Sequence, residues 1–135
     1  MRIEITKSYT IDIPENVIED VDGTVTSYWK RGEDSALQLS SIYLRTGDQI
    51  PAQQRMDERL AREENVSPTA FQVETVAPDH AGITFVDEQG TLWLYVYLVW
   101  SDLSIFATVF VPHDGINLRD TWQYQSMKSI RRTYN

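Results

Sequence analysis

The run TLWLYVYLVW, residues 91–100, constrains the fold most, because it has no charged side chain and holds two of the four Trp and two of the seven Tyr. As a helix it would cross only half of a bilayer, which takes about 20 apolar residues. As a strand it points alternate side chains to opposite faces of a sheet, and both sets are apolar. We therefore expect a central strand that is covered on both faces, and no membrane segment.

The two faces of this strand differ in chemistry. One face is largely aliphatic, and we expect it in the core: Leu92, Leu94, Val96, Leu98 and Trp100. The other face holds Trp93, Tyr95 and Tyr97, followed by Val99. A Tyr hydroxyl must reach water or a hydrogen-bond partner, so this face is compatible with a core, a groove or a binding surface. Trp93, Tyr95 and Tyr97 are therefore candidate binding residues.

Strands are also expected in the first third of the chain. In residues 2–13 every odd position except Lys7 is apolar, which is the alternation of a strand with one dry face; Lys7 leaves open a bend or a break into two strands. Residues 23–31 and 35–47 predict two further strands. In the last of these the apolar set changes parity between Leu39 and Ile42, which predicts a β-bulge near Ser40 and Ser41.

Two helices are expected. In residues 47–65, Asp48 is the predicted N-cap and Pro51 is tolerated in the first turn. The apolar residues of this helix lie roughly on one face: Ile50, Met56, Leu60 and Ala61. The second helix is predicted over residues 117–134, with Asn117 as N-cap and Asp120 three residues later. Its apolar stripe consists of Leu118, Trp122 and Ile130.

Four strand-like segments lie between the helices: residues 70–77, 82–86, 91–100 and 104–112. Connections of hairpin length, DEQG and SDL, join the last three, which predicts a meander. The prediction is one α+β domain over residues 1–135, with a mainly antiparallel sheet of about six to seven strands and two helices, in the order βββ-α-ββββ-α.

The net charge of −8 argues against nucleic acid as a partner. The basic C-terminal residues Lys128, Arg131 and Arg132 are interpreted as cations that complement a helix C-terminus. Carboxylates gather instead in an early segment that we expect to be turn-rich, and a basic protein partner is one possible use of them: Asp12, Glu15, Glu19, Asp20 and Asp22. The N-terminal residues lack the apolar run of a signal peptide, so we expect a cytoplasmic protein.

Signatures of catalysis are absent from the sequence. There is no Cys, G-x-S-x-G motif, phosphate-binding Gly loop or H-E-x-x-H motif. The D-x-D-G fragment at residues 20–23 lacks the remaining ligands of a calcium loop. His80 and His113 each lie beside an Asp in a turn, and a hydrolase that uses His113, Asp114 and a Ser stays open. We assign no catalytic residue, metal site or cofactor.

The element order and two segments, YTIDIPENV and LQLSSIYLRTGDQIPAQQRMDERLA, resemble the PsbP-like superfamily. That resemblance implies an α/β/α sandwich and a binding role, since the group includes a photosystem extrinsic protein, a nuclear-import factor that binds a small GTPase, and chaperones of type VI secretion effectors. The photosynthetic members carry targeting segments, and none is recognised here. A helix-grip fold is an alternative that would turn the aromatic strand into a pocket wall, and an NTF2-like fold fits the element order less well.

We therefore expect a non-catalytic protein-binding module, such as a chaperone, an adaptor or an immunity-type protein, with its oligomeric state open. The alternative is a carrier of a small apolar ligand, or an enzyme, with a pocket between the sheet and the C-terminal helix.

Overall fold

The structure, a computed structural model, describes residues 1–5, 8–45, 47 and 49–133. The first half holds five strands and a helix: β1 (Arg2–Ile5), β2 (Tyr9–Asp12), β3 (Val17–Asp22), β4 (Val25–Lys30), β5 (Ala36–Tyr43) and α1 (Ala52–Ala61). The second half holds the remaining elements: β6 (Thr69–Ala70), β7 (Asp79–Val86), β8 (Thr91–Val99), β9 (Leu103–Pro112), the 3-10 helix η1 (Leu118–Asp120), α2 (Trp122–Lys128) and β10 (Arg131–Arg132).

The strands form two antiparallel sheets. The larger has seven strands in the order β3-β4-β5-β9-β8-β7-β6, and the smaller has three in the order β1-β2-β10. The fold is therefore α+β and mostly sheet, as predicted, and the meander β7-β8-β9 is confirmed. The strand number of the larger sheet agrees with the prediction, whereas the three-stranded sheet was not predicted. In the described part of the chain, no helix is long and apolar enough to cross a bilayer.

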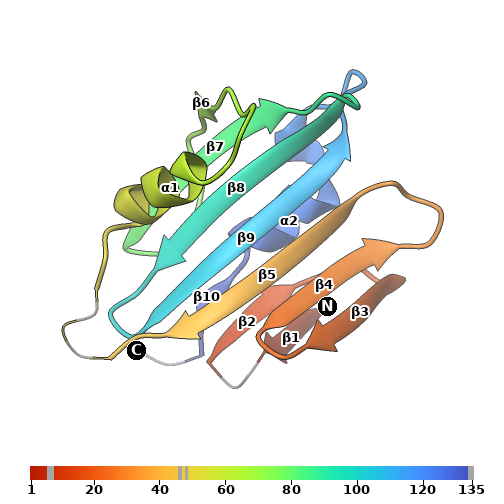
Figure 1. Cartoon of the computed structure of the whole chain (residues 1–135). Helices are drawn as coiled ribbons and strands as arrows, with labels where there is room; N and C mark the ends of the chain where they lie inside the picture. The colour runs from red at the N-terminus through yellow and green to blue at the C-terminus, as the bar shows by residue number, and fades with distance from the viewer. Residues whose placement is uncertain (6–7, 46, 48, 134–135) are drawn as a thin grey trace.

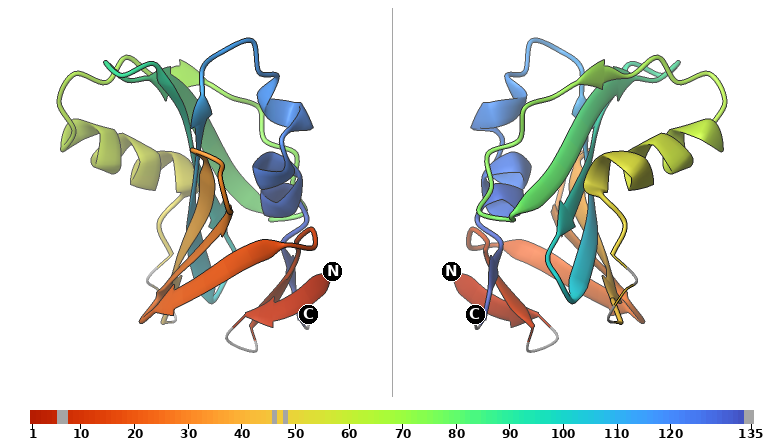
Figure 2. Two further views of the ribbon diagram at one scale, coloured as in Figure 1. Left: turned by 90° about the vertical axis from the view of Figure 1, so that its right-hand side faces the viewer. Right: turned by 90° about the vertical axis from the view of Figure 1, so that its left-hand side faces the viewer.

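The elements lie in three layers (Figures 1 and 2). Helix α1 lies on one face of the seven-stranded sheet, which we call the front face. Helix α2 and the small sheet lie on the opposite, back face. The likeness to the PsbP-like superfamily remains a hypothesis.

Strand β8 is central, as expected, with β9 on one side and β7 on the other. Its side chains Leu94, Val96 and Leu98 are fully buried in the back core. Tyr97 and Val99 belong to a second, smaller core on the front face. The prediction that both faces of this strand are covered is confirmed, although the cover differs in extent.

The back core is the larger of the two. Of the described residues, 21 are buried in its cluster and 6 in the front cluster. The back cluster draws residues from both sheets, α2 and the segment 71–77, whereas the front cluster joins α1 to β7 and β8. Burial of apolar surface is the main favourable contribution to folding, so most of the stability comes from the back core.

Helix α1 begins with Pro51 at its N-cap position, and its Ala52 N–H donates to the Asp79 carboxylate at 2.8 Å. The predicted N-cap Asp48 lies outside the described residues. Ala52 and Met56 face the sheet and are fully buried. Ala61, which the pattern placed on the same face, is exposed.

The N-terminal third agrees with the prediction in one respect and differs from it in another. The first expected strand is broken into the hairpin β1–β2, one of the two outcomes that Lys7 left open, and Lys7 itself lies outside the described residues. The acidic segment that was expected to be turn-rich contains strand β3, which forms a hairpin with β4. An edge strand needs few apolar residues, because little of it is buried, so its sequence resembles a loop.

The bulge predicted near Ser40 and Ser41 is absent. Strand β5 pairs with β9 in unbroken register from Ala36 to Tyr43. Ser41 points into the back core and hydrogen-bonds the Tyr9 hydroxyl, while Ile42 points to the front and is 55% exposed. The apolar residues shift from odd to even positions because Ser41, whose side chain is hydrogen-bonded, occupies a core position.

Residues 70–77 were predicted as a strand, but the structure has only the two-residue strand β6 (Thr69–Ala70) at the start of this segment, and the chain then leaves the sheet. Phe71 N–H donates to Gly82 O, after which Val73 and Ala77 enter the back core. A Cβ at Gly82 would collide with the Val73 side chain and lie 3.0 Å from Phe71 O. The absence of a side chain at Gly82 therefore lets residues 71–77 pass close to β7 on their way from the edge of the sheet to the back face, toward α2.

The C-terminal helix is shorter than predicted. Asn117 caps η1 by accepting from Arg119 N–H, and Thr121 then caps α2 by accepting from Tyr124 N–H. The helix ends at Lys128, and β10 pairs with β2, so Arg131 and Arg132 lie in a strand and not in a last helical turn. Ile130 is fully buried beyond the helix.

Candidate binding site on the uncovered front of the sheet

Helix α1 lies over β7 and β8, and no other helix or strand of the described chain covers the rest of the front face (Figures 1 and 2). We call the uncovered part the open face. It consists of the front-facing side chains of four strands, which the register aligns in rows: Phe110 and Ala36, with Trp29 nearby; Thr108, Gln38, Ser27 and Asp20; Phe106, Ser40, Val25 and Asp22.

Arg59 forms the border between α1 and the open face. Its guanidinium carbon lies 3.8 Å from the centroid of the Phe106 ring, and its Nε donates to the Tyr97 hydroxyl at 2.7 Å. The alkyl part of such an Arg covers apolar surface while its head stays polar. The aromatic surface that continues past Arg59 is not covered by the helix.

The predicted aromatic residues are integrated into the fold to different degrees. Tyr97 is buried under α1. Tyr95 is half-buried and donates to the Glu63 carboxylate, and burial, followed by the Glu63 charge, raises its pKa to about 12. Trp93 is half-buried, and its Nε1 donates to Asp87 at 2.9 Å. Their polar atoms thus have intramolecular partners, so a binding surface at Trp93 and Tyr95 would use ring faces and edges.

Three aromatic residues of the open face escaped the sequence analysis: Trp29, Phe106 and Phe110. All three are half-buried. Phe110 lies 5.0 Å from Trp93 between ring centroids, and Phe106 lies 5.3 Å from Tyr95, so the aromatic surface extends from β8 onto β9. Trp29 and Phe110 line a hollow of about 440 Å³. Strand alternation combined with hairpin register would have placed Phe106 and Phe110 beside the β8 aromatics.

The predicted acidic residues do not form one site. Asp20 and Asp22 are exposed on β3 in the rows of the open face. Glu19 points to the back and accepts from the Tyr28 hydroxyl at 2.8 Å, and burial and this bond raise the Tyr28 pKa. Asp12 lies in β2, where a hydrogen bond from the Met1 amino group lowers its pKa. Glu15 is exposed in the turn before β3.

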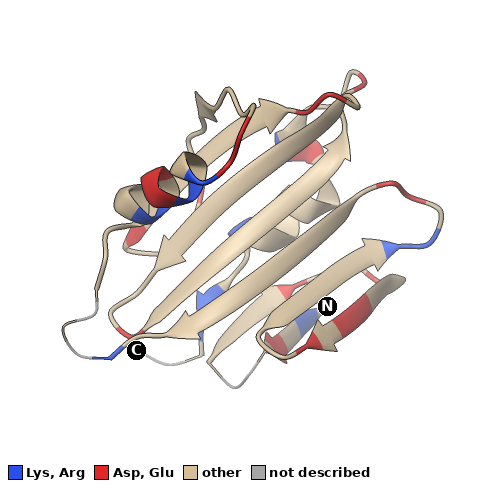
Figure 3. Cartoon of the chain, viewed as in Figure 1, with Lys and Arg blue, Asp and Glu red and all other residues tan. Residues whose placement is uncertain are grey.

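Asp20 and Asp22 therefore share a face with the aromatic residues, whereas Asp12, Glu15 and Glu19 lie elsewhere. Figure 3 shows the acidic colour of β3 at one edge of the large sheet and the charged helix α1 near the other. The strands between them display few charges. The open face is thus an aromatic and weakly polar surface with carboxylates along one border.

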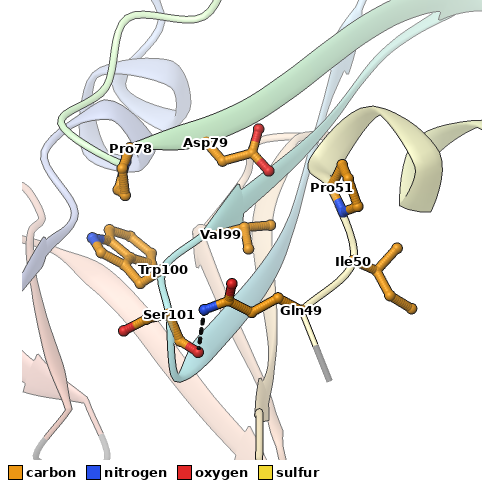
Figure 4. Close-up of a pocket in the computed structure, with 8 residues that line it drawn as sticks. All are labelled: Gln49, Ile50, Pro51, Pro78, Asp79, Val99, Trp100 and Ser101. Atoms are coloured by element: carbon orange, nitrogen blue, oxygen red, sulfur yellow. Dashed lines mark hydrogen bonds between the residues drawn. The ribbon is translucent and has the colours of Figure 1, made fainter. Parts of the chain in front are cut away.

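A pocket of about 410 Å³ lies where α1 begins (Figure 4). Trp100, Val99 and two prolines, Pro51 and Pro78, supply apolar lining. Its polar groups already have roles in the fold: Gln49 donates to Ser101 O at 3.1 Å, and Asp79 accepts from the first helical N–H. The pocket offers a ligand little polar recognition.

A second pocket, of about 490 Å³, lies between the end of β9, residues 33–35 and the start of α2. Val111, Ile116 and Trp122 line it. The Trp122 indole donates to Glu33 at 3.1 Å, and the Gln123 amide donates to Ser35 at 2.6 Å. This is the place where the sequence suggested a pocket between sheet and C-terminal helix.

The histidines lie apart from these surfaces. His80 lies in β7, and its Nδ1 is 3.2 Å from Ala77 O in the segment before that strand. His113 is exposed in the turn after β9, and its backbone N–H donates to Gly90 O. Among the described residues, no group of three or more His, Cys, Asp or Glu is placed to hold a metal ion.

Comparison with known proteins adds the fold alone. No protein-family model and no curated protein sequence matches the chain. A crystal structure from Bacteroides thetaiotaomicron VPI-5482, at 1.50 Å resolution, is similar with a TM-score of 0.66 and 10% sequence identity. The match covers 98% of this chain and 48% of that chain, so this chain spans about half of its length. A likeness at this identity supports the α+β architecture.

Proposed function

We propose that this protein is a non-catalytic binding module that acts in the cytoplasm and holds a partner protein against its open face, as a chaperone, adaptor or immunity-type protein does. The observation that supports this most is the unequal cover of the sheet. The back face is packed by α2 and a second sheet, whereas no helix or strand of the described chain lies over Trp29 and Phe110 on the front, and Phe106 is covered only by Arg59.

The chemistry of the open face fits a protein partner. Aromatic side chains provide large contact areas and are enriched at the centres of protein interfaces, whereas charged side chains are depleted there. Ser27, Gln38 and Ser40 add hydrogen-bonding groups between the rings. Asp20 and Asp22 at the border attract a basic partner, in keeping with the net charge of −8.

The test uses the full chain, immobilised and exposed to native lysate of the source organism at low and moderate salt, with retained proteins quantified by mass spectrometry. The wild-type protein should retain one protein stoichiometrically. Trp29→Ser/Phe110→Ser should lose it, and Asp20→Lys/Asp22→Lys should retain less of it, with the largest deficit at low salt, where repulsion between the new Lys residues and a basic partner is least screened.

Val76→Ser is the matched control, because Val76 is 56% exposed and lies in the segment 71–77, away from the open face. Retention that survives the Trp29→Ser/Phe110→Ser change, with all variants folded by circular dichroism, would place the interface elsewhere and contradict the proposal.

A small-ligand carrier is the second candidate, and the pocket lined by Val111, Ile116 and Trp122 supports it. Native mass spectrometry of the purified protein distinguishes the two. A bound small molecule that Ile116→Asp displaces would favour the carrier, whereas a partner retained by wild type and by Ile116→Asp alike would favour the binding module.

A further inference from the structure

Strand β3 is an edge of the large sheet with an unused row of backbone groups. Among the described residues it pairs with β4 alone. Its two-residue hairpin has Gly23 at φ 64° in the first central position, as a type II′ turn requires. Asp22 and Val25 form the hydrogen-bonded pair that closes this hairpin. Because hydrogen-bonded and non-hydrogen-bonded pairs alternate along an antiparallel ladder, the N–H and C=O groups of Glu19 and Val21 point away from β4.

The opposite edge of the sheet is protected. Strand β6 has two residues, and the chain then crosses to the back, where Arg119 donates to Gln72 O at 2.7 Å and holds the crossing segment. A short strand followed by a covering loop is a common way to block an edge. By contrast, β3 has six residues, and the described chain makes no hydrogen bond to its outward side.

The side chains of β3 select what can pair with it. Asp20 and Asp22 point to the front, and Val21, which points to the back, is 60% exposed. A second copy of β3 would set carboxylates against carboxylates, and like charges across a strand pair are destabilising. A strand with Lys or Arg on the front and an apolar residue opposite Val21 is complementary on both faces.

We propose that β3 takes up an extended basic segment of the partner protein as an eighth strand of the sheet. This inference rests on the proposed function, because the added strand extends the open face by one strand at its acidic border. Backbone hydrogen bonds along β3 provide affinity in such strand addition, and alternate side chains provide specificity.

The test measures fluorescence anisotropy of a labelled peptide of alternating Lys and Val, seven residues long and blocked at both ends, with the full-length protein at low salt. The wild-type protein should bind it, and a copy N-methylated at its Val residues should bind at least about tenfold more weakly, because each methyl group removes a hydrogen-bond donor. A peptide with Glu in place of Lys should not bind.

Two variants locate the contact. Val21→Pro removes an outward N–H that β4 does not use, a place where an edge strand tolerates Pro, and should weaken binding about tenfold. Val21→Thr retains the N–H and should stay within about threefold of wild type. Absence of peptide binding to the wild type, equal binding of the methylated peptide, or no effect of Val21→Pro in a folded variant would each overturn strand addition.

The inference and the proposed function fail separately. If lysate capture is lost in Trp29→Ser/Phe110→Ser but retained in Val21→Pro, the open face is an interface and strand addition is wrong. If the peptide binds at β3 as expected but neither the wild type nor any variant retains a protein from lysate, then β3 can pair with an added strand but the proposed function fails.

Discussion

The two faces of the large sheet are built from the same strands but are used differently. On the back, side chains from three layers meet, and residues such as Leu37, Leu39 and Tyr28 are fully buried. On the front, α1 covers two strands, and side chains of the same β4 and β5, such as Ser27 and Gln38, face solvent. Folding thus depends mainly on one face, which leaves part of the other available for binding.

The polar contacts follow the same division. On the back, Arg119 of η1 contacts two other parts of the chain: it donates to Glu74 and Gln72 O in the segment 71–77 and to the Tyr124 hydroxyl in α2, and its guanidinium lies over Phe71. On the front, Arg59 makes the corresponding contacts with Tyr97 and Phe106 at the border of the open face. Arg119 therefore holds the back layer together, whereas Arg59 lies where the front layer, helix α1, stops covering the sheet.

The sharpest test of this difference is a pair of neighbours on β5 that point to opposite faces. Leu37→Ala removes a fully buried side chain from the back core and should lower the free energy of unfolding by about 2–5 kcal/mol. Gln38→Ala removes an exposed front side chain and should change it by less than about 0.5 kcal/mol. Urea unfolding followed by Trp fluorescence measures both. Similar losses at the two positions would mean that the front contributes to stability as the back does.

Gly82→Ala tests the crossing segment that helps to close the back. The new methyl group meets the Val73 side chain and the Phe71 carbonyl, and overpacking of this kind costs about 1–3 kcal/mol. Thr84→Ala, on the same face of the same strand, is the control and should cost less. Hydrogen exchange at residues 71–77 should rise in the Gly82 variant alone; unchanged protection there would show that the segment accommodates a methyl group.

The sequence predicted the two faces of β8 and the meander around it, but little of the open face. Alternation along β8 identified both of its faces, because a strand with two apolar faces has few other solutions. The errors fall on elements whose sequences are decided by tertiary contacts: Ser41 in the core, the acidic β3 and the crossing segment 71–77. A Ser that bonds Tyr9 across two sheets leaves no local signal.

The candidate site was predicted in part. Trp93 and Tyr95 do border the open face, and Asp20 and Asp22 do lie on it, yet nothing in the sequence says that these pairs share a face. That depends on the strand order, which places β9 and β5 between β8 and β4. Trp29 was missed because a single Trp in a short strand does not reveal whether a layer covers it.

A smaller effect is expected at the border of the open face. Arg59→Met replaces the guanidinium over Phe106 with an apolar side chain and removes the hydrogen bond to Tyr97, which should cost about 1 kcal/mol. Arg62→Met, at the exposed C-cap of α1, is the control and should be nearly neutral. If Arg62→Met costs as much in urea unfolding, the effect belongs to helix charge and not to the border contacts.

The smallest effect is a dependence on alkaline pH at Tyr95. Its pKa is raised to about 12, because burial and the Glu63 carboxylate disfavour the phenolate. The unfolded chain loses this proton near pH 10, so the stabilisation is fully present below pH 10 and is lost as the pH rises toward 12. Glu63→Gln removes the charge and should bring the midpoint, read from tyrosinate absorbance relative to Tyr95→Phe, closer to 10 without reaching it. A midpoint that does not move would mean that burial beside α1 raises the Tyr95 pKa without a contribution from the Glu63 charge.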